Sequence, residues 1–410
     1  MKEHFYFDNA ATTLPKPEPV YQFMDQFFRS HGVNAGRSGH ELAIEAEAMI
    51  VQTRCMLGDF FGYGGDPSRV TFSLNATDSM NMALLGLIHP SDHMVITRME
   101  HNAVLRPANH FERDSNVAVT RVAADGNGYV DPEDVRRSIT SDTRAVVVNH
   151  ASNVVGSVQD IETIGKFVRD TDAVFIVDTC QTAGVVPIQM DESSIDILVY
   201  TGHKGLFGPS GIGGMIVAKD IDIRQVRTGG TGVNSVSPFH PDEYPHRLET
   251  GTVSIPGIAG LHAAQKWFAE LGKSKSTSTP GSHNEACRIA LQHIHEVETH
   301  STLQLINAFD ALPEVIIYGP RGDQPRISTI SINIGDLPAE QVGSMLDADH
   351  RICVRPGLHC APLVHEDQGT LKRNGTVRFA PGFFTDEEDI AQAIEGVRSI
   401  AEYQESRTGT

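Results

Sequence analysis

Short β-rich runs alternate with helical stretches along the first part of the chain. Polar or glycine-rich residues follow each run, which is typical of strands that end in loops. Strands that alternate with helices predict a mostly parallel sheet covered by helices on both faces. The runs are "RVTF", "HMVIT", "VAVTRV", "RAVVVNH", "AVFIVD", "ILVYT" and "GMIVA".

A long helix and a change in the order of elements indicate a second domain. In "GTVSIPGIAGLHAAQKWFAEL" a proline precedes an Ala/Leu-rich amphipathic stretch, which predicts a helix that leaves the sheet domain. Beyond it, strands are predicted in "ISTISINI", "RICVR" and "TVRFAP", with helices over 338–348 and 385–402, an α+β order. We therefore expect a large domain over 16–256 and a small domain made of 1–15 and 257–410.

Composition and charge narrow the function classes. The chain has 410 residues, of which 40% are hydrophobic, so we expect a soluble protein with a sizeable core. Its net charge of −19 argues against nucleic acid as a partner, because phosphate backbones require clustered Lys and Arg. Without an apolar leader or a run of apolar residues long enough to span a membrane, a cytoplasmic location is expected. The polar stretch 272–283, "GKSKSTSTPGSH", is predicted to be a mobile surface loop.

Cysteines and histidines give no sign of a metal site. The five cysteines are scattered and include no CxxC pair, which suits neither a disulfide framework nor structural zinc. Cys55 and Cys287 are interpreted as small buried apolar residues. His293 and His295 are two positions apart, so on a helix they point to different faces and no metal is expected.

A strand end followed by glycines contains the first candidate for chemistry. In "DILVYTGHKGLFGPSGIGGMIVA", Lys204 comes directly after an apolar strand, where an amine removed from water can act as a Schiff-base nucleophile. In "AVFIVDTCQTAG", Asp178 lies at the carboxyl end of another strand, the edge where open α/β sheets bind ligands. Asp178 alone is as often a helix or turn cap. Together with Lys204 it favours a pyridoxal site, in which a carboxylate pairs with the protonated ring nitrogen.

The stretch "LNATDSMNMALLGLI" predicts a phosphate site. A strand and a polar turn precede a helix that begins near Thr77, whose free N–H groups and dipole favour a dianion. Thr77 and the backbone of Asp78 are the candidate ligands. Either residue is also a candidate N-cap, and the two roles use the same helix end.

Eight motifs occur in order along nearly the whole chain. With them the chain resembles the cysteine desulfurases of the class V aminotransferase group. The resemblance implies the fold type I architecture of pyridoxal-phosphate proteins, an α/β fold with a seven-stranded sheet in the large domain, and a homodimer. The motifs are "FDNAATT", "SLNATDSMN", "MEHNA", "NHASNVVG", "VDTCQTAG", "TGHKGLFGPSGIGG", "LETGTVSIPGIAGL" and "RPGLHCAPL".

The resemblance assigns roles around the cofactor, pyridoxal 5'-phosphate. Lys204 matches the lysine that bonds covalently to it, and Asp178 matches the partner of its pyridine nitrogen. Gln181 resembles the group near the ring hydroxyl, and His101 the imidazole that stacks on the ring. Asn153 matches the asparagine near the substrate carboxylate and the ring oxygen.

Further matches concern the phosphate and the substrate. His203 resembles a phosphate ligand, and Thr252 resembles the residue that reaches the phosphate from the partner subunit. Arg378 matches the arginine that binds the substrate carboxylate, for which a planar guanidinium is suited. Arg355 and Arg37 are weaker candidates for lining the pocket.

Cys360, in "RPGLHCAPL", falls where these desulfurases carry the nucleophile that accepts sulfur. The pattern is that of the short-loop subgroup, with Leu358 where a histidine is frequent, and His359 is a candidate for holding the thiolate. The resemblance implies that L-cysteine is converted to L-alanine while its sulfur passes to Cys360 as a persulfide. An acceptor protein or a small thiol then takes the sulfur, as in iron–sulfur cluster assembly.

Other functions stay open from the sequence. A selenocysteine lyase shares the fold and cofactor, and in a class V aminotransferase or epimerase Cys360 would be incidental. A non-catalytic scaffold is disfavoured because no catalytic position is missing, and a nicotinamide dehydrogenase because no GxGxxG turn follows an early strand. The acceptor and the preference for cysteine over selenocysteine are not determined by the sequence.

Overall fold

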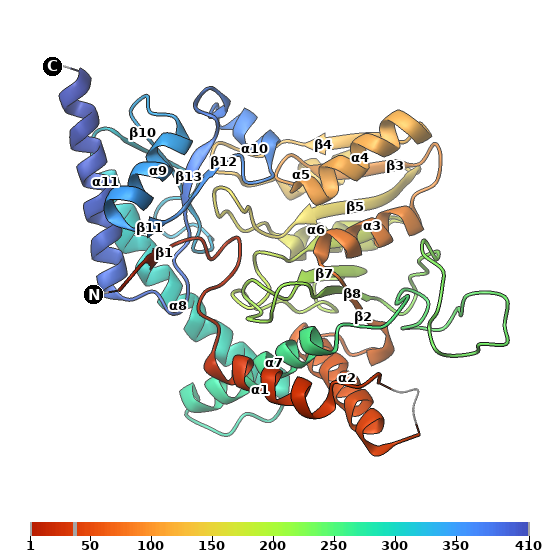
Figure 1. Cartoon of the computed structure of the whole chain (residues 1–410). Coiled ribbons are helices and arrows are strands. Elements are labelled where there is room, and N and C mark those ends of the chain that lie inside the picture. Colours follow the sequence, from red (N-terminus) through yellow and green to blue (C-terminus); the bar gives the residue numbers. More distant parts are fainter. Residues whose placement is uncertain (1, 36–38, 409–410) are drawn as a thin grey trace.

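A large sheet forms the centre of the molecule (Figure 1). The structure is a computed structural model that describes residues 2–35 and 39–408. Within these residues seven strands pair in the order β2-β8-β7-β6-β5-β3-β4. β8 is antiparallel to β2 and β7 and the remaining pairs are parallel, so the predicted mostly parallel sheet is confirmed. The strands are β2 (Val70–Ser73), β3 (His93–Thr97), β4 (Ala118–Val122), β5 (Thr143–Asn149), β6 (Val174–Asp178), β7 (Ile197–Thr201) and β8 (Gly213–Val217).

Both faces of this sheet are buried, which explains why its central strands are apolar without interruption. Successive side chains on a strand point to opposite faces. On β6, Val174 and Ile176 pack into one core cluster, whereas Phe175 and Val177 pack into the other. Helices α3 and α4 cover the first face, and α2, α5, α6 and α7 cover the second. These helices are α2 (Glu41–Phe60), α3 (Ala76–Leu87), α4 (Asn102–Ser115), α5 (Pro132–Ser138), α6 (Ile161–Arg169) and α7 (Ile255–Lys275).

A second sheet lies beside the first, with its own apolar core. Its described strands are antiparallel in the order β12-β13-β10-β9. Helices α8, α9 and α11 contribute to its core, and α8 also reaches the core of the large sheet. The elements are α8 (His283–Asp310), β9 (Val315–Tyr318), β10 (Ile330–Ile334), α9 (Ala339–His350), β12 (Arg355–Gly357), α10 (Pro362–Asp367), β13 (Thr376–Phe379) and α11 (Glu387–Thr408), with short 3-10 helices at Pro67–Arg69 and Leu371–Arg373.

The N-terminal arm joins this second sheet region although it is far away in sequence. β1 (Phe5–Tyr6) pairs in parallel with β11 (Ile352–Cys353), and Figure 1 shows the amino terminus beside the C-terminal helix α11. The run "RICVR" was predicted as one strand, and this was wrong. Val354 separates β11 from β12, and the two strands join different sheets. After the arm, α1 (Glu18–His31) packs against α7.

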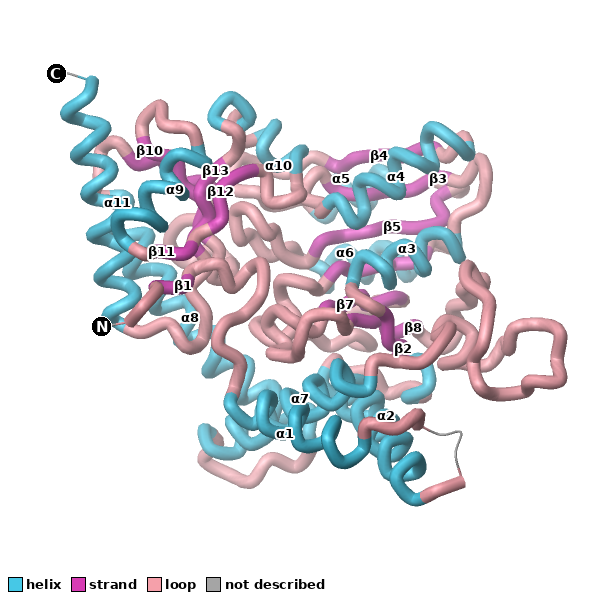
Figure 2. Tube along the Cα trace, in the orientation of Figure 1, coloured by secondary structure: helices cyan, strands magenta, loops and turns pink. Residues whose placement is uncertain are grey.

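Two connections between elements differ greatly in length. The predicted loop over 272–283 is shorter than expected, because α7 continues to Lys275 and α8 begins at His283. Residues 218–254, between β8 and α7, contain no helix or strand, and Figure 2 shows this segment as a long loop that extends away from the sheet. Val236 and Phe239 on this loop are 96% and 80% exposed.

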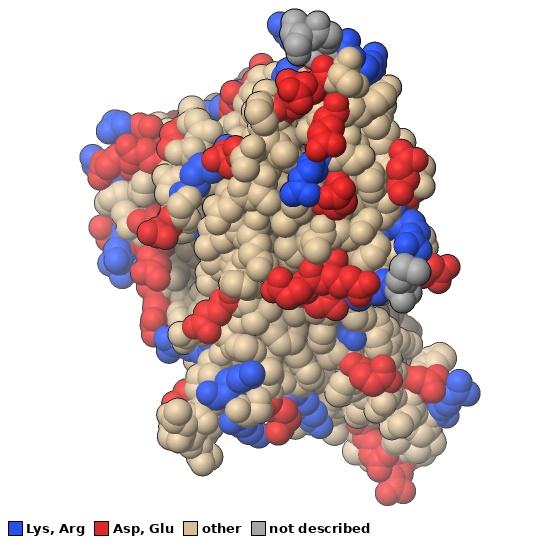
Figure 3. All heavy atoms as spheres, turned by 90° about the vertical axis from the view of Figure 1, so that its left-hand side faces the viewer, with Lys and Arg blue, Asp and Glu red and all other residues tan. Residues whose placement is uncertain are grey.

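The surface reflects the acidic composition. Figure 3 shows acidic side chains in clusters on the face that includes α11, whose first turn carries Glu387, Glu388 and Asp389. Among the helices of the described residues, none has the length and apolar content that crossing a membrane requires.

Candidate active site

A cavity of about 210 Å³ lies at the carboxyl ends of the central strands of the large sheet. Asn149 and Asp178 end β5 and β6, where they are register partners, and Thr201 ends β7. In parallel α/β sheets this edge is the ordinary place for a ligand. The predicted residues that line the cavity are Thr77, His101, Asn153, Asp178, Gln181, His203 and Lys204.

Lys204 lies in the loop after β7 and lines this cavity. Burial lowers the pKa of its amine, against the opposing effects of Cys180 and the Asp178 carboxylate. A lowered pKa leaves more of the amine unprotonated at neutral pH, as a nucleophile or base needs. Asp178 is buried, and one carboxylate oxygen accepts the Cys180 N–H at 2.9 Å. The Asp178 carboxylate also interacts with the Cys180 side chain, and it lines the cavity.

The N-terminal arm holds the backbone beside Lys204, which the sequence analysis did not predict. The carbonyl oxygen of His203 accepts hydrogen bonds from Thr12 Oγ1 at 3.0 Å, Thr13 N at 3.2 Å and Lys16 Nζ at 3.0 Å. Thr13 Oγ1 also donates to the Lys204 carbonyl at 3.1 Å. Burial lowers the pKa of Lys16 to about 8. The only sign of these contacts in the sequence was the two adjacent threonines and the lysine of "TTLPK".

His101 is the N-cap of α4 and faces the cavity. Its Nδ1 accepts the N–H of Ala103 at 3.0 Å, so the neutral ring carries its proton on Nε2. Burial lowers the pKa of His101, which favours that neutral ring.

The neighbouring Glu100 was also missed. Its Oε1 accepts Thr97 Oγ1 at 2.7 Å and Asn149 N at 2.8 Å, which fixes the turn that carries His101. Burial raises the pKa of Glu100 to about 8. This carboxyl therefore acts on the site by holding its backbone, and the signal for it was its position in "MEHNA".

The N-terminus of α3, where the sequence predicts a phosphate site, lines the cavity, but its N-cap is not one of the two predicted residues. Asn75 is the N-cap, and its Oδ1 accepts the Asp78 N–H at 3.0 Å. The Asp78 carboxylate pairs with Arg227 at 3.1 Å and does not line the cavity. The backbone N–H of Asp78, predicted as a phosphate ligand, is therefore already used in the hydrogen bond to the N-cap. Thr77 and the first free N–H groups of the helix remain for an anion.

Two buried polar atoms show that the cavity fits a polar ligand. Among the described residues, His203 Nδ1 and Asn153 Oδ1 have no hydrogen-bond partner. Burial lowers the pKa of His203 to about 4, so its ring is neutral. Unpaired buried polar atoms are costly unless a ligand satisfies them. With Lys204, Asp178 and a helix N-terminus, the donor set matches an aldehyde-bearing pyridine with a phosphate.

Cys360 lies next to this cavity, in the loop after β12. Its side chain lines a groove of about 420 Å³ between α3 and α4, which we call the thiol groove. The thiol groove and the cavity share Thr77, His101 and Ala103 as wall residues. The thiol groove and the cavity are therefore adjacent, and Cys360 lies on the side of the groove.

The Cys360 loop is fixed in an unusual backbone conformation. Cys360 and His359 have φ values of 58° and 50°, in the left-handed region that non-glycine residues rarely adopt. The Cys360 carbonyl accepts Asn102 N at 2.7 Å, and the His359 carbonyl accepts Asn153 Nδ2 at 2.5 Å. The Nε2 of the His359 ring donates to the Arg355 carbonyl at 2.8 Å, which helps to hold the loop.

The two arginines of the small sheet differ in their partners. Arg378 is 1% exposed and binds Asp8 at 2.8 Å and the Asn153 carbonyl at 3.0 Å. Its Nε has no hydrogen-bond partner within the described part of the chain. Arg355 is its register partner on β12 and is less buried. Their charges lie close enough to lower the pKa of Lys204.

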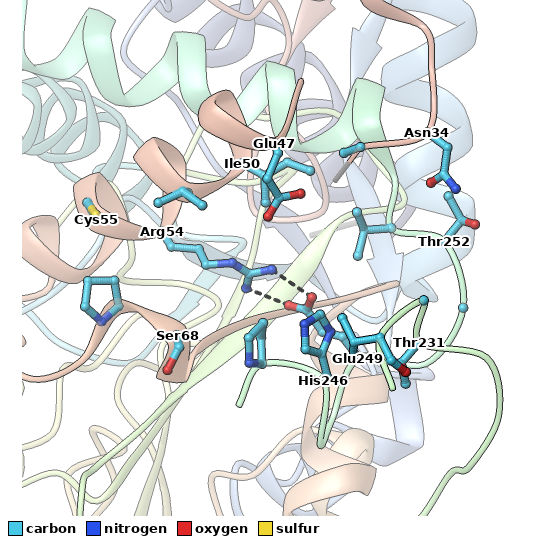
Figure 4. A pocket seen from close by; sticks show the side chains of 18 of the residues that line it. Asn34, Glu47, Ile50, Arg54, Cys55, Ser68, Thr231, His246, Glu249 and Thr252 are labelled. Atoms are coloured by element: carbon cyan, nitrogen blue, oxygen red, sulfur yellow. Dashed lines mark hydrogen bonds and ion pairs between the residues drawn. The ribbon is translucent and has the colours of Figure 1, made fainter. Parts of the chain in front are cut away.

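Thr252 does not line the cavity of its own chain. Figure 4 shows it with Asn34 on the wall of another cavity, of about 500 Å³, where Arg54 and Glu249 are joined by hydrogen bonds. The structure therefore separates Thr252 from Lys204. Arg37, the remaining candidate, lies outside the described residues.

Comparisons with known proteins place the whole chain in a family. A sequence model of the family described as aminotransferase class-V matches residues 5–304 and 284–392. The probable cysteine desulfurase of Pyrococcus abyssi is 31% identical over 384 residues, covering 92% of this chain and 89% of that protein. The cysteine desulfurase IscS of Dictyoglomus turgidum is 27% identical over 99% of this chain and 98% of that protein. The apo structure of cysteine desulfurase from Thermococcus onnurineus NA1 superposes with a TM-score of 0.87 at 29% identity, covering 98% and 95% of the two chains.

Proposed function

The chain belongs to the class-V aminotransferase family, and from this premise we propose that it is a cysteine desulfurase that uses pyridoxal 5'-phosphate. It converts L-cysteine to L-alanine and transfers the sulfur to Cys360. The observation that carries the proposal is the pairing of two features. A cavity with an amine of lowered pKa lies beside a tethered cysteine, and the two share a wall. Ordinary transamination needs the amine but no thiol.

The residues that would hold the cofactor are those of the cavity. Lys204 would bond to its aldehyde carbon, Asp178 would pair with the ring nitrogen, and Gln181 would lie near the ring hydroxyl. His101 would cover one ring face. When bound, the cofactor supplies an electron-withdrawing ring that stabilises a carbanion at Cα of the substrate. Its phosphate is assigned to Thr77, the N–H groups of α3, His203 and Thr252 of a second subunit.

Each step is then carried by a residue of the chain. Arg378, with Arg355 beside it, binds the substrate carboxylate, and Asn153 is placed between carboxylate and ring. Lys204 takes the Cα proton. The Cys360 thiolate attacks the substrate sulfur, so an S–S bond forms as the Cβ–S bond breaks; a proton is added at Cβ, and Lys204 returns its proton to Cα to complete alanine. The thiol and L-cysteine thereby become a persulfide and alanine, with no external oxidant.

A homodimer is part of the proposal because each site is incomplete without a partner. Thr252 lies away from the cavity of its own chain, at the base of the loop 218–254. Val236 and Phe239 on this loop expose apolar side chains that a partner surface would cover. We further propose a division into the domains 16–256 and 1–15 with 257–410, a cytoplasmic location and a role in supplying sulfur for iron–sulfur cluster assembly.

A single-turnover reaction tests the proposal. Cofactor-loaded protein is mixed with one equivalent of L-cysteine, alanine is quantified, and the persulfide is located by mass spectrometry. We expect one alanine per site and a persulfide on Cys360, both lost in Lys204→Ala, whereas Cys360→Ala loses the persulfide. Cys353→Ala is the matched control, since Cys353 is a partly buried thiol of the same region.

Other outcomes would assign another function. Full alanine formation by Cys360→Ala, with selenocysteine turned over faster than cysteine, would indicate a selenocysteine lyase. Consumption of pyruvate without release of sulfur would indicate an aminotransferase.

A further inference from the structure

The thiol groove has the size and shape of a small-molecule site. Its volume of about 420 Å³ falls within the range of ligand pockets, about 300–1,000 Å³. Leu85, Pro107 and Phe111 give it apolar walls, and Cys360 lines it. Cys360 does not line the cofactor cavity. An outer sulfur carried by Cys360 is therefore reached from the thiol groove.

The charge of the thiol groove differs from that of the molecule. The described residues that line it include no Asp or Glu, although the chain has a net charge of −19. Arg106 is exposed at the groove and forms no hydrogen bond or ion pair within the described part of the chain. The other basic side chains of the groove are His101, whose pKa is lowered by burial so that its ring is neutral, and His110, whose Nδ1 lies 3.4 Å from the Asp114 carboxylate and 2.8 Å from Arg113 Nη2. Arg106 is thus the cation that the groove presents to a ligand.

Helix geometry relates this cation to the thiol. The Asn102 N–H binds the Cys360 carbonyl, so the first turn of α4 anchors the cysteine loop. Arg106 lies four residues further along α4, on the same face as Asn102 and about 6 Å along the helix axis. A ligand of a few carbon atoms spans that distance, with one end at Cys360 and an anion at Arg106.

We propose that the thiol groove binds the sulfur acceptor, and that this acceptor is a small thiol bearing a carboxylate. The inference rests on the proposed function, since it needs a persulfide on Cys360. The carboxylate pairs with Arg106. The acceptor thiolate attacks the outer sulfur of the persulfide, a new S–S bond forms, and the old one breaks to release the Cys360 thiolate. One sulfur atom moves and no redox partner is required.

A preloaded persulfide gives a direct test. Protein is reacted with one equivalent of L-cysteine, desalted, and its Cys360 persulfide is quantified by mass spectrometry. It is then mixed with 3-mercaptopropionate or with 2-mercaptoethanol, thiols of similar size of which only the first has a carboxylate. Loss of the persulfide is followed in the wild type, in Arg106→Gln and in Arg136→Gln, which removes an exposed charge of α5 on the other face of the sheet. Rates are normalised to the measured persulfide.

The expected result is selective. Arg106→Gln should slow transfer to 3-mercaptopropionate about tenfold, because a charge-assisted pair is lost, and should change transfer to 2-mercaptoethanol less than twofold. Arg136→Gln should change neither rate. Equal rates for wild type and Arg106→Gln with the carboxylate thiol would overturn the inference. The inference would also be overturned if the only defect of Arg106→Gln were a higher KM for L-cysteine in alanine formation, since Arg106 would then bind the substrate. If no persulfide forms on Cys360 in the wild type, the proposed function itself has failed.

Discussion

The buried ion pair between Arg54 and Glu249 supports the segment that ends at Thr252. Arg54 Nη1 and Nη2 bind the Glu249 carboxylate at 2.6 and 2.7 Å, and the two residues are 6% and 8% exposed. Arg54 also donates to the Val70 carbonyl at 2.5 Å, and Glu249 accepts the Phe72 N–H at 2.7 Å. The pair therefore joins α2, β2 and the end of the loop 218–254. Figure 4 shows it inside the cavity that Thr252 also lines.

Removing one partner leaves the other as an unpaired buried charge. Arg54→Met leaves the Glu249 carboxylate with one N–H donor, and Glu249→Gln keeps an acceptor for Phe72 but leaves the guanidinium without a carboxylate. Each single variant should lose about 3–5 kcal/mol of unfolding free energy. The double variant carries no buried charge at this place, so its loss should be smaller than the sum of the two by about 3 kcal/mol.

Urea unfolding measures this coupling as a double-mutant cycle. Midpoints are taken from circular dichroism and from the fluorescence of Trp267, the single tryptophan, at one protein concentration because a dimer is proposed. Coincident transitions from the two probes are required before free energies are compared. Arg113→Gln, at an exposed pair on α4, is the control and should change stability by less than about 1 kcal/mol. Additive losses, or single losses below about 1 kcal/mol, would refute the reasoning.

Three further predictions concern the surroundings of the site. Lys16→Met removes a charged donor from the His203 carbonyl and should lower stability by about 1.5–3 kcal/mol and speed cofactor loss, as followed by absorbance during dialysis. Gly184→Ala should give little folded protein in a solubility and circular dichroism assay, because its Cβ would lie 2.0 Å from a backbone carbonyl oxygen and its φ is 92°. The control Gly251→Ala has a φ of 88° but open space around the Cβ, so it should fold and lose only about 1 kcal/mol of unfolding free energy. Burial raises the pKa of Glu298 from 4.5 to about 7, so its contribution to stability is fully present below pH 4.5 and is lost as pH rises through 7. In the wild type the free energy of unfolding should fall by about 3 kcal/mol between pH 4.5 and 8, and Glu298→Gln should remove this fall. Urea unfolding at several pH values measures it, and an equal pH dependence of wild type and variant would contradict the prediction.

The strands of the large sheet and most residues that line the cavity could be predicted from the local sequence pattern. Apolar runs bounded by polar residues predict strands because each residue's exposure depends on its immediate neighbours and on which face it points to. Asp178 and Lys204 were identifiable because each ends or follows such a run, and parallel topology brings strand ends to one edge. Cys360 was proposed as the nucleophile through the motif in which it stands.

Contacts between distant segments were decided only by the tertiary structure. Lys16 meets the His203 carbonyl across 187 positions, and Arg54 meets Glu249 across 195, so no local window contains both partners. For the same reason "RICVR" was predicted as one strand, although its two halves pair with different segments.

At the first turn of α3, too, the local sequence predicted part of the structure and the tertiary structure decided the rest. The sequence indicated a cap and an anion site, but several polar residues there competed for the cap. Asn75 is the N-cap, and the carboxylate of Asp78 pairs with Arg227 from the distant loop 218–254. By itself, the sequence thus determined which elements form and which residue types reach the sheet edge. The packed chain decided which side chains meet, because a hydrogen bond or ion pair between remote residues exists only after the elements between them have folded.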